Sequence, residues 1–495
     1  MPSKPNILLI MTDQQRCDSL GCYGSDFVRT PNIDRLARDG IRFDNCYVAN
    51  TICTPSRASI MTGKHLPGHG VYRLHDILPS SEKLFPWYLR DAGYITALFG
   101  KLHVSGRSFE RENRNPNDGF DIYEYAMNPH DVGGTYNSYA QWLKRKHPEF
   151  YQTLAKEGRN VKDIPEEAHF TTWSAERTIE FIREQKSNGQ PFFAFMSVVD
   201  PHDPYGDYPR ASLNCICEDK IPAPHGICEM DVHKLPEPVV REHEHSYLGN
   251  FHNYDMEDIK EMRKGYYASV AFLDKQVGKV LNCLKELNLY DDTLIIFLSD
   301  HGDMLGDHSL LIKGGYFFDE CTRVPLIIKP PASVTYPSVV SGLVQAYDIA
   351  ATILHSAGIS PDVIQKAMPD SRNLLDRTFL KTCRDEVYCL YRNTGIGDER
   401  VYFSPPNHAS MIRTRKYKLC LYHNVKTEPQ GELYDMEKDP AEERNLWNDQ
   451  TYAQIKTTLL IKLCDWLVSQ EISVLGSRGG EMFPDKSQWL NLNAL

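Results

Sequence analysis

Short, uninterrupted hydrophobic runs recur along the first two thirds of the chain. They lie at 6–11, 95–99, 192–199, 293–298 and 324–328. Runs of this length that are rich in β-branched or aromatic residues are typical of strands buried on both faces of a parallel sheet. The pattern therefore predicts at least five buried strands that are distant from one another in sequence.

Segments with helical spacing lie between these runs, and most of them end at a glycine that can serve as a C-terminal cap. The predicted helices are 31–38, 173–185, 267–287 and 348–357. Strands that alternate with helices indicate an α/β fold, here a doubly wound, mostly parallel sheet flanked by helices. A polar segment at 202–252, rich in Pro, His and Cys, is expected to be a long insertion that shapes a pocket.

The pattern changes after residue 375. Short polar strands at 410–414, 418–422 and 432–435 precede a helix at 452–469. This predicts a smaller antiparallel sheet covered by one helix. A chain of 495 residues also exceeds what a single hydrophobic core usually supports. We therefore expect two domains, a catalytic α/β domain at 1–375 and a C-terminal α+β subdomain at 376–495.

Composition and charge narrow the classes of partner. The chain has 41% hydrophobic and 24% charged residues and a net charge of −11, which argues against a general nucleic-acid binder. The apolar run at 7–11 is too short for a membrane span and lacks the features of a signal peptide. The expectation is a cytoplasmic protein that binds neither membranes nor nucleic acid.

Thirteen cysteines, an odd number, favour reduced thiols over a disulfide framework. Cys215, Cys217 and Cys228 lie close to His225 and His233 in the polar insertion. Two interpretations stay open for this cluster. It is either a metal site, although its spacing fits no common zinc motif, or a set of loop thiols.

Polar residues follow four of the predicted strands directly. Ligands of open α/β sheets bind outside the carboxyl ends of the strands, so these side chains are expected to converge on one crevice. They are Asp13 and Gln14, Lys101 and His103, His202, and Asp300 and His301. Taken alone, an Asp after a strand is more often a cap or turn residue. Together, Asp13, Gln14, Asp300 and His301 offer the oxygen ligands and single imidazole that suit Ca²⁺, Mg²⁺ or Mn²⁺.

Cys53 is predicted to lie at a helix N-terminus. In the segment C-T-P-S-R-A-S, Thr54 can serve as N-cap and Pro55 fits the first helical position. Helix N-termini favour anions such as sulfate or phosphate, and Arg57 would add a positive charge one turn later. For a cysteine considered alone, a buried structural thiol is the alternative.

The segment at 53–63, C-T-P-S-R-A-S-I-M-T-G, resembles the first signature of the formylglycine-dependent (type I) sulfatases. The segment at 93–103, G-Y-I-T-A-L-F-G-K-L-H, resembles the second. Both are long and occur in the family's order. The resemblance extends from Asn6 to about Asp439, since 299–303 (S-D-H-G-D) and 432–435 (E-L-Y-D) are also similar to family segments.

This resemblance implies an alkaline-phosphatase-like fold with one divalent metal ion bound by Asp13, Gln14, Asp300 and His301. It also implies that a formylglycine-generating or maturase enzyme converts Cys53 to formylglycine, whose hydrate is the nucleophile. Many members have a second Asp in place of Gln14 and Asn in place of His301. The resemblance implies Ca²⁺ first, with Mn²⁺ or Mg²⁺ behind it.

The resemblance further implies roles for the basic residues. One hydroxyl of the hydrate attacks sulfur while His202 and Lys313 supply a proton to the leaving alcohol. His103 then removes a proton from the second hydroxyl, which releases sulfate. Lys101, Arg57 and Lys313 would hold the sulfate oxygens as negative charge builds.

The expected function is thus hydrolysis of a small-molecule or carbohydrate sulfate ester. The nearest alternative is a phosphonate monoester or phosphodiester hydrolase of the same superfamily, which shares an Asp-Gln pair like Asp13 and Gln14. Lys101 and His103 favour the sulfatase. A second alternative is a non-catalytic protein that binds sulfated ligands, which requires Cys53 to stay unmodified. A third is a cysteine hydrolase, which requires a histidine that activates the thiol.

The substrate and the oligomeric state are not specified by the sequence. The stretch at 110–139 is expected to form part of the pocket wall. Arg107, Arg114, His130 and Arg400 are candidates for binding a sugar carboxylate or a second sulfate, or they are ordinary surface charges.

Overall fold

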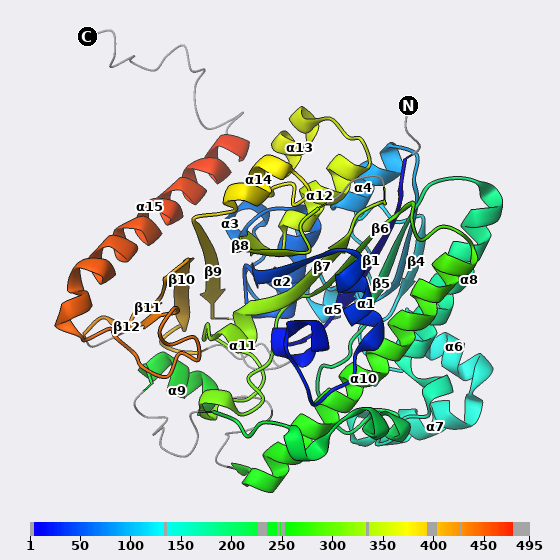
Figure 1. Cartoon of the computed structure of the whole chain (residues 1–495), viewed down its shortest axis with the longest axis horizontal. Helices are drawn as coiled ribbons and strands as arrows, with labels where there is room; N and C mark the ends of the chain where they lie inside the picture. Colours follow the sequence, from blue (N-terminus) through cyan, green and yellow to red (C-terminus); the bar gives the residue numbers. More distant parts are fainter. Residues whose placement is uncertain are drawn as a thin grey trace.

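The residues that the computed structural model describes form a central eight-stranded sheet (Figure 1). Described are 4–132, 136–225, 235–244, 248, 253–332, 336–393, 403–425 and 428–478, with side chains up to 471. The strands of this sheet are β1 (Asn6–Thr12), β2 (Ile41–Tyr47), β3 (Ile95–Gly100), β4 (Ile122–Tyr125), β5 (Phe192–Ser197), β6 (Thr293–Ser299), β7 (Arg323–Lys329) and β8 (Val339–Gln345). Their order across the sheet is β4-β3-β5-β1-β6-β7-β2-β8.

The sheet is mostly parallel, as predicted. β1 pairs in parallel with β5 on one side and β6 on the other, and β3 pairs in parallel with β4 and β5. β7 is the exception, because it runs antiparallel to both β6 and β2. The strands β3, β5, β1 and β6 are therefore adjacent and point the same way, so their carboxyl ends meet at one edge.

Helices cover both faces of the sheet. In chain order, the helices of the described residues are α1 (Pro31–Asp39), α2 (Cys53–Thr62), α3 (Leu66–His69), α4 (Phe85–Asp91), α5 (Arg107–Glu110), α6 (Ser138–Lys146), α7 (Pro148–Glu157), α8 (Phe170–Asn188), α9 (Glu237–Glu244), α10 (Met256–Glu286), α11 (Asp319–Thr322), α12 (Asp348–Ser356), α13 (Pro361–Ala367), α14 (Arg377–Thr382) and α15 (Ala453–Arg478). The layer of α1, α8 and α10 packs on one face, and α2, α4 and α12 pack on the other.

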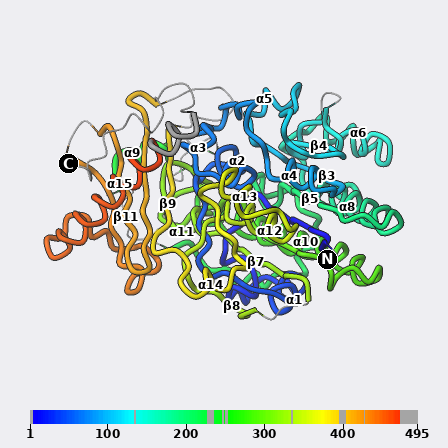
Figure 2. The backbone as a smooth tube through the Cα atoms, turned by 90° about the horizontal axis from the view of Figure 1, so that it is seen from above, coloured from blue at the N-terminus to red at the C-terminus, as the bar shows by residue number. Residues whose placement is uncertain are grey.

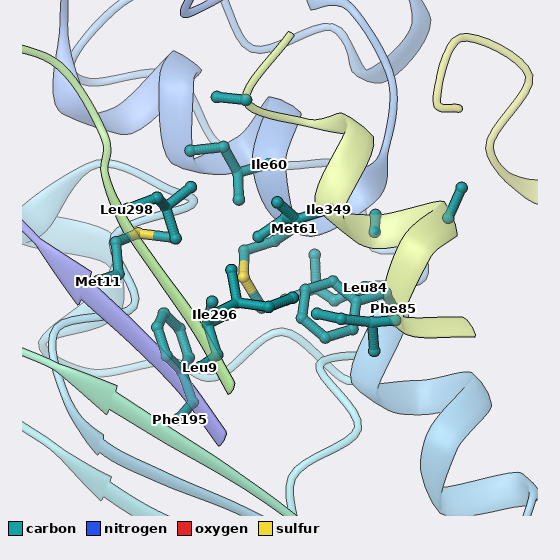
Figure 3. Packing of buried hydrophobic residues seen from close by; sticks show 14 of the residues in the cluster. Leu9, Met11, Ile60, Met61, Leu84, Phe85, Phe195, Ile296, Leu298 and Ile349 are labelled. Atoms are coloured by element: carbon teal, nitrogen blue, oxygen red, sulfur yellow. The ribbon is translucent and has the colours of Figure 1, made fainter. Parts of the chain in front are cut away.

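Two cores result from the alternation of side chains along each strand. In β1, Leu9 and Met11 point toward α2, α4 and α12, where Met61 and Phe85 meet them (Figure 3). Leu8 and the other alternate residues of β1 point toward α1, α8 and α10. Both faces of β1 are thus buried, which explains why its sequence is continuously hydrophobic.

A second, four-stranded sheet follows in the chain, and within the described residues its strands are all antiparallel. They are β9 (Glu386–Arg392), β10 (His408–Thr414), β11 (Tyr417–His423) and β12 (Gln430–Asp435), in the order β12-β11-β10-β9. Helix α15 covers one face, where Leu459 and Leu463 pack on Ile412 and Leu419. Figure 2 shows α15 and β11 together at one side of the molecule.

The other face of the small sheet packs on the large domain. Met411 and Tyr391 share a buried cluster with Tyr47, Ile52 and residues that precede β7. The fold class expected from the sequence is therefore confirmed, while the domain boundary between 375 and 376 stays a prediction. Among the described residues, no helix combines the length and apolarity needed to cross a membrane.

Candidate active site

The residues predicted to form a site converge at the shared edge of β3, β5, β1 and β6. Asp13 and Gln14 directly follow β1, and Asp300 and His301 directly follow β6. Lys101 and His103 follow β3, and His202 lies a few residues after β5. The amide N–H of Gln14 donates to Asp300 Oδ1 at 3.1 Å, which ties the two strand ends together.

Three of these residues offer ligand atoms to a single point. Asp13, Asp300 and His301 each present one such atom, all within 4.8 Å of one another. His301 Nε2 lies 3.5 Å from Asp13 Oδ1 and 3.8 Å from Asp300 Oδ1. Asp13 Oδ1 and His301 Nε2 are buried and have no hydrogen-bond partner among the described residues. Buried polar atoms are rarely left unpartnered, so this arrangement fits a bound divalent cation.

The two carboxylates are held by buried cations. Arg57 Nε donates to Asp300 Oδ2 at 2.5 Å, and its Nη2 lies 3.7 Å from Asp13 Oδ2. Lys101 Nζ donates to the same Asp13 oxygen. Burial raises the pKa of Asp13, but the charges of Lys101, His202 and Arg57 outweigh it and hold this pKa well below the usual range. Asp13 is therefore ionised at neutral pH, as a metal ligand must be.

Arg57 is fully buried, and its contacts are internal to the protein. Besides Asp300, it donates from Nη1 to the carbonyl of Lys101 at 2.9 Å and to Ser197 Oγ at 3.0 Å. Its guanidinium thus joins α2 to the ends of β3, β5 and β6. These contacts favour a positioning role for Arg57, in addition to the contact with sulfate that the sequence predicts.

Cys53 is the first residue of α2, and Ile52 is the N-cap. The expectation that Thr54 caps this helix is wrong. Ile52 adopts the extended conformation of a cap residue, and the Thr54 hydroxyl donates instead to the Leu74 carbonyl at 3.0 Å. Thr54 Oγ1 also lies 2.9 Å from His103 Nε2. The predicted placement of Cys53 at a helix N-terminus is confirmed.

The surroundings of Cys53 stabilise negative charge. Burial raises the pKa of its thiol, but the charges of Lys101 and His103 and the neighbouring imidazoles of His103 and His301 lower it well below the usual range. Cys53 is 4% exposed. An oxyanion formed on this side chain would therefore meet the same cations and hydrogen-bond donors.

His202 and Lys313 form a second pair of basic groups. Lys313 Nζ lies 2.6 Å from His202 Nε2 and also donates to Gln14 Oε1. His202 Nδ1 lies 2.8 Å from the carbonyl of Asp203. Burial lowers the pKa of His202 despite the nearby Asp203 carboxylate. A neutral imidazole that donates from Nδ1 and accepts the Lys313 proton at Nε2 satisfies all these contacts.

Three further residues support the site but were not predicted. Tyr205 donates its hydroxyl to Asp303 Oδ2 at 2.6 Å, and Gln14 Nε2 donates to the same carboxylate at 2.5 Å. The Glu110 carboxylate accepts the backbone N–H of His103 at 2.9 Å and so anchors the loop after β3. Asp303 lies within the S-D-H-G-D segment, which is a signal that could have identified it. Glu110, in the four-residue helix α5, and Tyr205, in a loop, belong to no such pattern.

The backbone is strained at two of these positions. Gln14 has φ of 67° and His103 has φ of 54°, in the left-handed region that residues other than glycine seldom adopt. Strain of this kind costs about 1–3 kcal/mol and concentrates at functional sites. The loops after β1 and β3 are therefore held in place by their contacts.

The candidates for substrate recognition have partners within the protein. Arg114 pairs with Asp118, and His130 Nε2 lies 3.2 Å from Asp207 Oδ2. Arg107 lies 3.3 Å from Asp131. Arg400 lies outside the described residues. In the polar insertion, Cys215 and Cys217 are free thiols. Cys228 and His233 lie outside the described residues.

Comparisons with known proteins find relatives over most of the chain. The sulfatase family model matches residues 5–359, and the model for the C-terminal region of N-sulphoglucosamine sulphohydrolase matches 306–468. An arylsulfatase of Clostridium perfringens is 30% identical, over 91% of this chain and 92% of its own length. An N-acetylglucosamine-6-O-sulfatase of Bacteroides thetaiotaomicron is 27% identical, over 92% and 85%. Among solved structures, a phosphonate monoester hydrolase of Silicibacter pomeroyi is 25% identical, with a TM-score of 0.78 over 95% of this chain and 96% of that one.

Proposed function

Because this chain belongs to the sulfatase family of sulfuric ester hydrolases, we propose that it releases sulfate from a carbohydrate or other small-molecule ester through a formylglycine made from Cys53. The observation that carries this proposal is the setting of Cys53. It begins α2 among Lys101, His103 and His301, which lower the pKa of its thiol and would offset the charge of a nucleophile there. A carbohydrate substrate is favoured by the likeness to the N-acetylglucosamine-6-O-sulfatase.

Asp13, Gln14, Asp300 and His301 would hold the metal ion. The two unpartnered atoms at Asp13 and His301 support this assignment. Ca²⁺ is the first candidate, with Mn²⁺ or Mg²⁺ behind it, since carboxylate and amide oxygens dominate the set. When bound, such an ion polarises the sulfate oxygens and lowers the pKa of a coordinated hydroxyl.

Two separate groups of residues would handle the protons. His103 lies close enough to Cys53 to lower the pKa of its side chain, and it would take a proton there. Lys313 Nζ lies 2.6 Å from His202 Nε2, so this pair would donate a proton to the departing alcohol. Lys101 is placed to balance the negative charge of both Asp13 and the nucleophile. Arg57 acts mainly by orienting Asp300.

The rival activity is phosphonate monoester hydrolysis, and it is tested on matched aryl esters. We expect kcat/KM for an aryl sulfate to exceed that for the corresponding phenyl phosphonate, because Lys101 and His103 face the reacting group. A preference for the phosphonate would overturn the sulfatase assignment while leaving the fold unaffected. Lys101→Ser should reduce the sulfatase activity more than the phosphonate activity.

A formylglycine-generating or maturase enzyme is the partner that this proposal requires. Co-expression with such an enzyme should raise specific activity, and Cys53→Ala should remove that gain. The cytoplasmic location expected from the sequence stays a prediction.

A further inference from the structure

We propose that the chain carries a second metal site, in which His225, His308 and Glu320 bind a zinc ion. The site is separate from the one at Asp13, Asp300 and His301. His225 comes from the polar insertion, His308 from the loop after β6 and Glu320 from α11. This inference does not depend on the proposed sulfatase mechanism.

The three side chains present one ligand atom each within 4.8 Å of one another. His225 Nε2 lies 3.1 Å from Glu320 Oε1, and His308 Nε2 lies 4.0 Å from Glu320 Oε2. Donor atoms around a tetrahedral zinc ion are separated by about 3.3 Å. The observed spacing therefore needs only small side-chain rotations to match zinc coordination.

The hydrogen bonding of His308 supports the proposal independently. Its side chain is fully buried, and neither ring nitrogen has a hydrogen-bond partner among the described residues. Glu320 Oε2 is likewise buried and unpartnered. The His308 ring stacks on Phe318 at 3.9 Å, which fixes its plane, and its Nε2 faces the Glu320 carboxylate. A buried imidazole with two unsatisfied nitrogens is costly unless one of them binds a ligand.

The balance of charges around these three side chains is compatible with a bound cation. Arg16 pairs with Asp18 and with Asp307, each at 2.7 Å, and Arg263 Nη1 lies 3.1 Å from Asp307 Oδ1. The two guanidiniums are thus neutralised by two aspartates. The Glu320 carboxylate then adds one more negative charge beside the imidazoles.

Two imidazoles and one carboxylate suit zinc better than calcium or magnesium, which prefer all-oxygen sites. Three protein ligands leave the fourth position for water. His225, with a side chain that is 31% exposed, provides the path by which an ion and a water molecule can enter.

Zinc at this point would fasten the loop that carries Lys313. The His308 N–H donates to the carbonyl of His225 at 3.0 Å, and the Asp303 N–H donates to the carbonyl of Glu320 at 3.0 Å. The ligands thus connect the polar insertion, the loop after β6 and α11. The ion would stabilise the loop between Asp303 and Lys313 without touching the substrate.

The test measures zinc bound per chain by the full-length protein. The protein is incubated with zinc in excess Ca²⁺, which occupies the first site, and free metal is removed by gel filtration. We expect about one zinc per chain, lost in Glu320→Gln and His225→Asn. Zinc should be retained in His355→Asn, a histidine outside both clusters, and in Asp300→Asn.

Two further measurements guard against misfolded variants. Co²⁺ in place of zinc should give the visible absorption bands of tetrahedral cobalt, absent in His225→Asn, whose partly exposed position should leave the fold intact by circular dichroism. Zinc should also raise the Tm of the wild type and not that of His225→Asn. If the wild type bound no more zinc than Glu320→Gln, or if Asp300→Asn abolished zinc binding, the second site would not exist.

Discussion

Replacing Lys313 with Met tests how the leaving group receives its proton. Lys313 Nζ lies 2.6 Å from His202 Nε2, and methionine keeps the length of the side chain while removing the ammonium. General acid catalysis contributes about 100- to 10,000-fold to a rate, which is about 3–5 kcal/mol of barrier. The variant should therefore lose about that much in kcat/KM on an ester with a poor leaving group.

The leaving group distinguishes this role from a general loss of binding. Over a series of aryl sulfates, the loss in kcat/KM should be largest for esters whose leaving phenol has a high pKa. It should be small for nitrophenyl esters, whose leaving anions need no proton. Lys279→Met, which removes an exposed lysine paired with Glu166, is the matched control and should leave the whole series unchanged. A loss of equal size across the series would refute the assignment of Lys313 and His202 as the proton donor.

Three other predictions concern the metal, the pH dependence of stability and the core. Asp300→Asn should lose metal and activity together, measured by metal analysis and turnover; full activity in metal-stripped protein would contradict it. Burial lowers the pKa of His65 in the folded protein to about 3. In the unfolded chain the pKa of a histidine is near 6.5, so between these two values only the unfolded chain binds a proton at this residue. The stability of the fold therefore decreases as the pH drops below about 6.5. The loss should reach about 2 kcal/mol at pH 5 in urea unfolding, and His65→Gln should flatten that slope. Leu9→Ala should lower the free energy of unfolding by about 2–5 kcal/mol, because Leu9 is fully buried between the sheet and α2 (Figure 3); an unchanged urea midpoint would refute it.

The sequence identified those strands whose two faces are both buried. β1, β3, β5 and β6 lie in the middle of the sheet, so their sequences are nearly all hydrophobic. β2 was not predicted, because Arg42 and Asp44 interrupt its pattern and pair with each other instead of with the core. β4 is a four-residue edge strand, too short to give a signal.

The long helix α10 was predicted to begin at 267 but begins at Met256. Its first turns are mostly polar, and Asp255 and Asp258 close a capping box there. The extra turns escaped detection because the apolar periodicity becomes clear only where the helix reaches the sheet. The capping box itself was the signal that could have extended the prediction.

The candidate site was predictable where its residues directly follow strands, as Asp13 and Asp300 do. The family resemblance implied a joint role for His202 and Lys313, but their contact joins segments that are far apart, and the sequence alone carries no distance between them. The support that Glu110 gives to the loop at His103 escaped prediction as well, since the four-residue helix α5 that carries Glu110 is too short to show periodicity. What the sequence lacks is the contact between loops, which only the folded chain specifies.

The chemical state of Cys53 in active enzyme is the most direct test of the mechanism. A thiol or simple alcohol would leave a stable covalent ester after attack, whereas an aldehyde hydrate has a second hydroxyl through which sulfate is expelled. The test is mass spectrometry of the peptide that contains Cys53 and Arg57. The fraction of this peptide that carries an aldehyde should rise in proportion to the specific activity of the preparation. Inactive protein made without a maturing enzyme should carry an intact thiol. Fully active enzyme with an unmodified cysteine at this position would contradict the account.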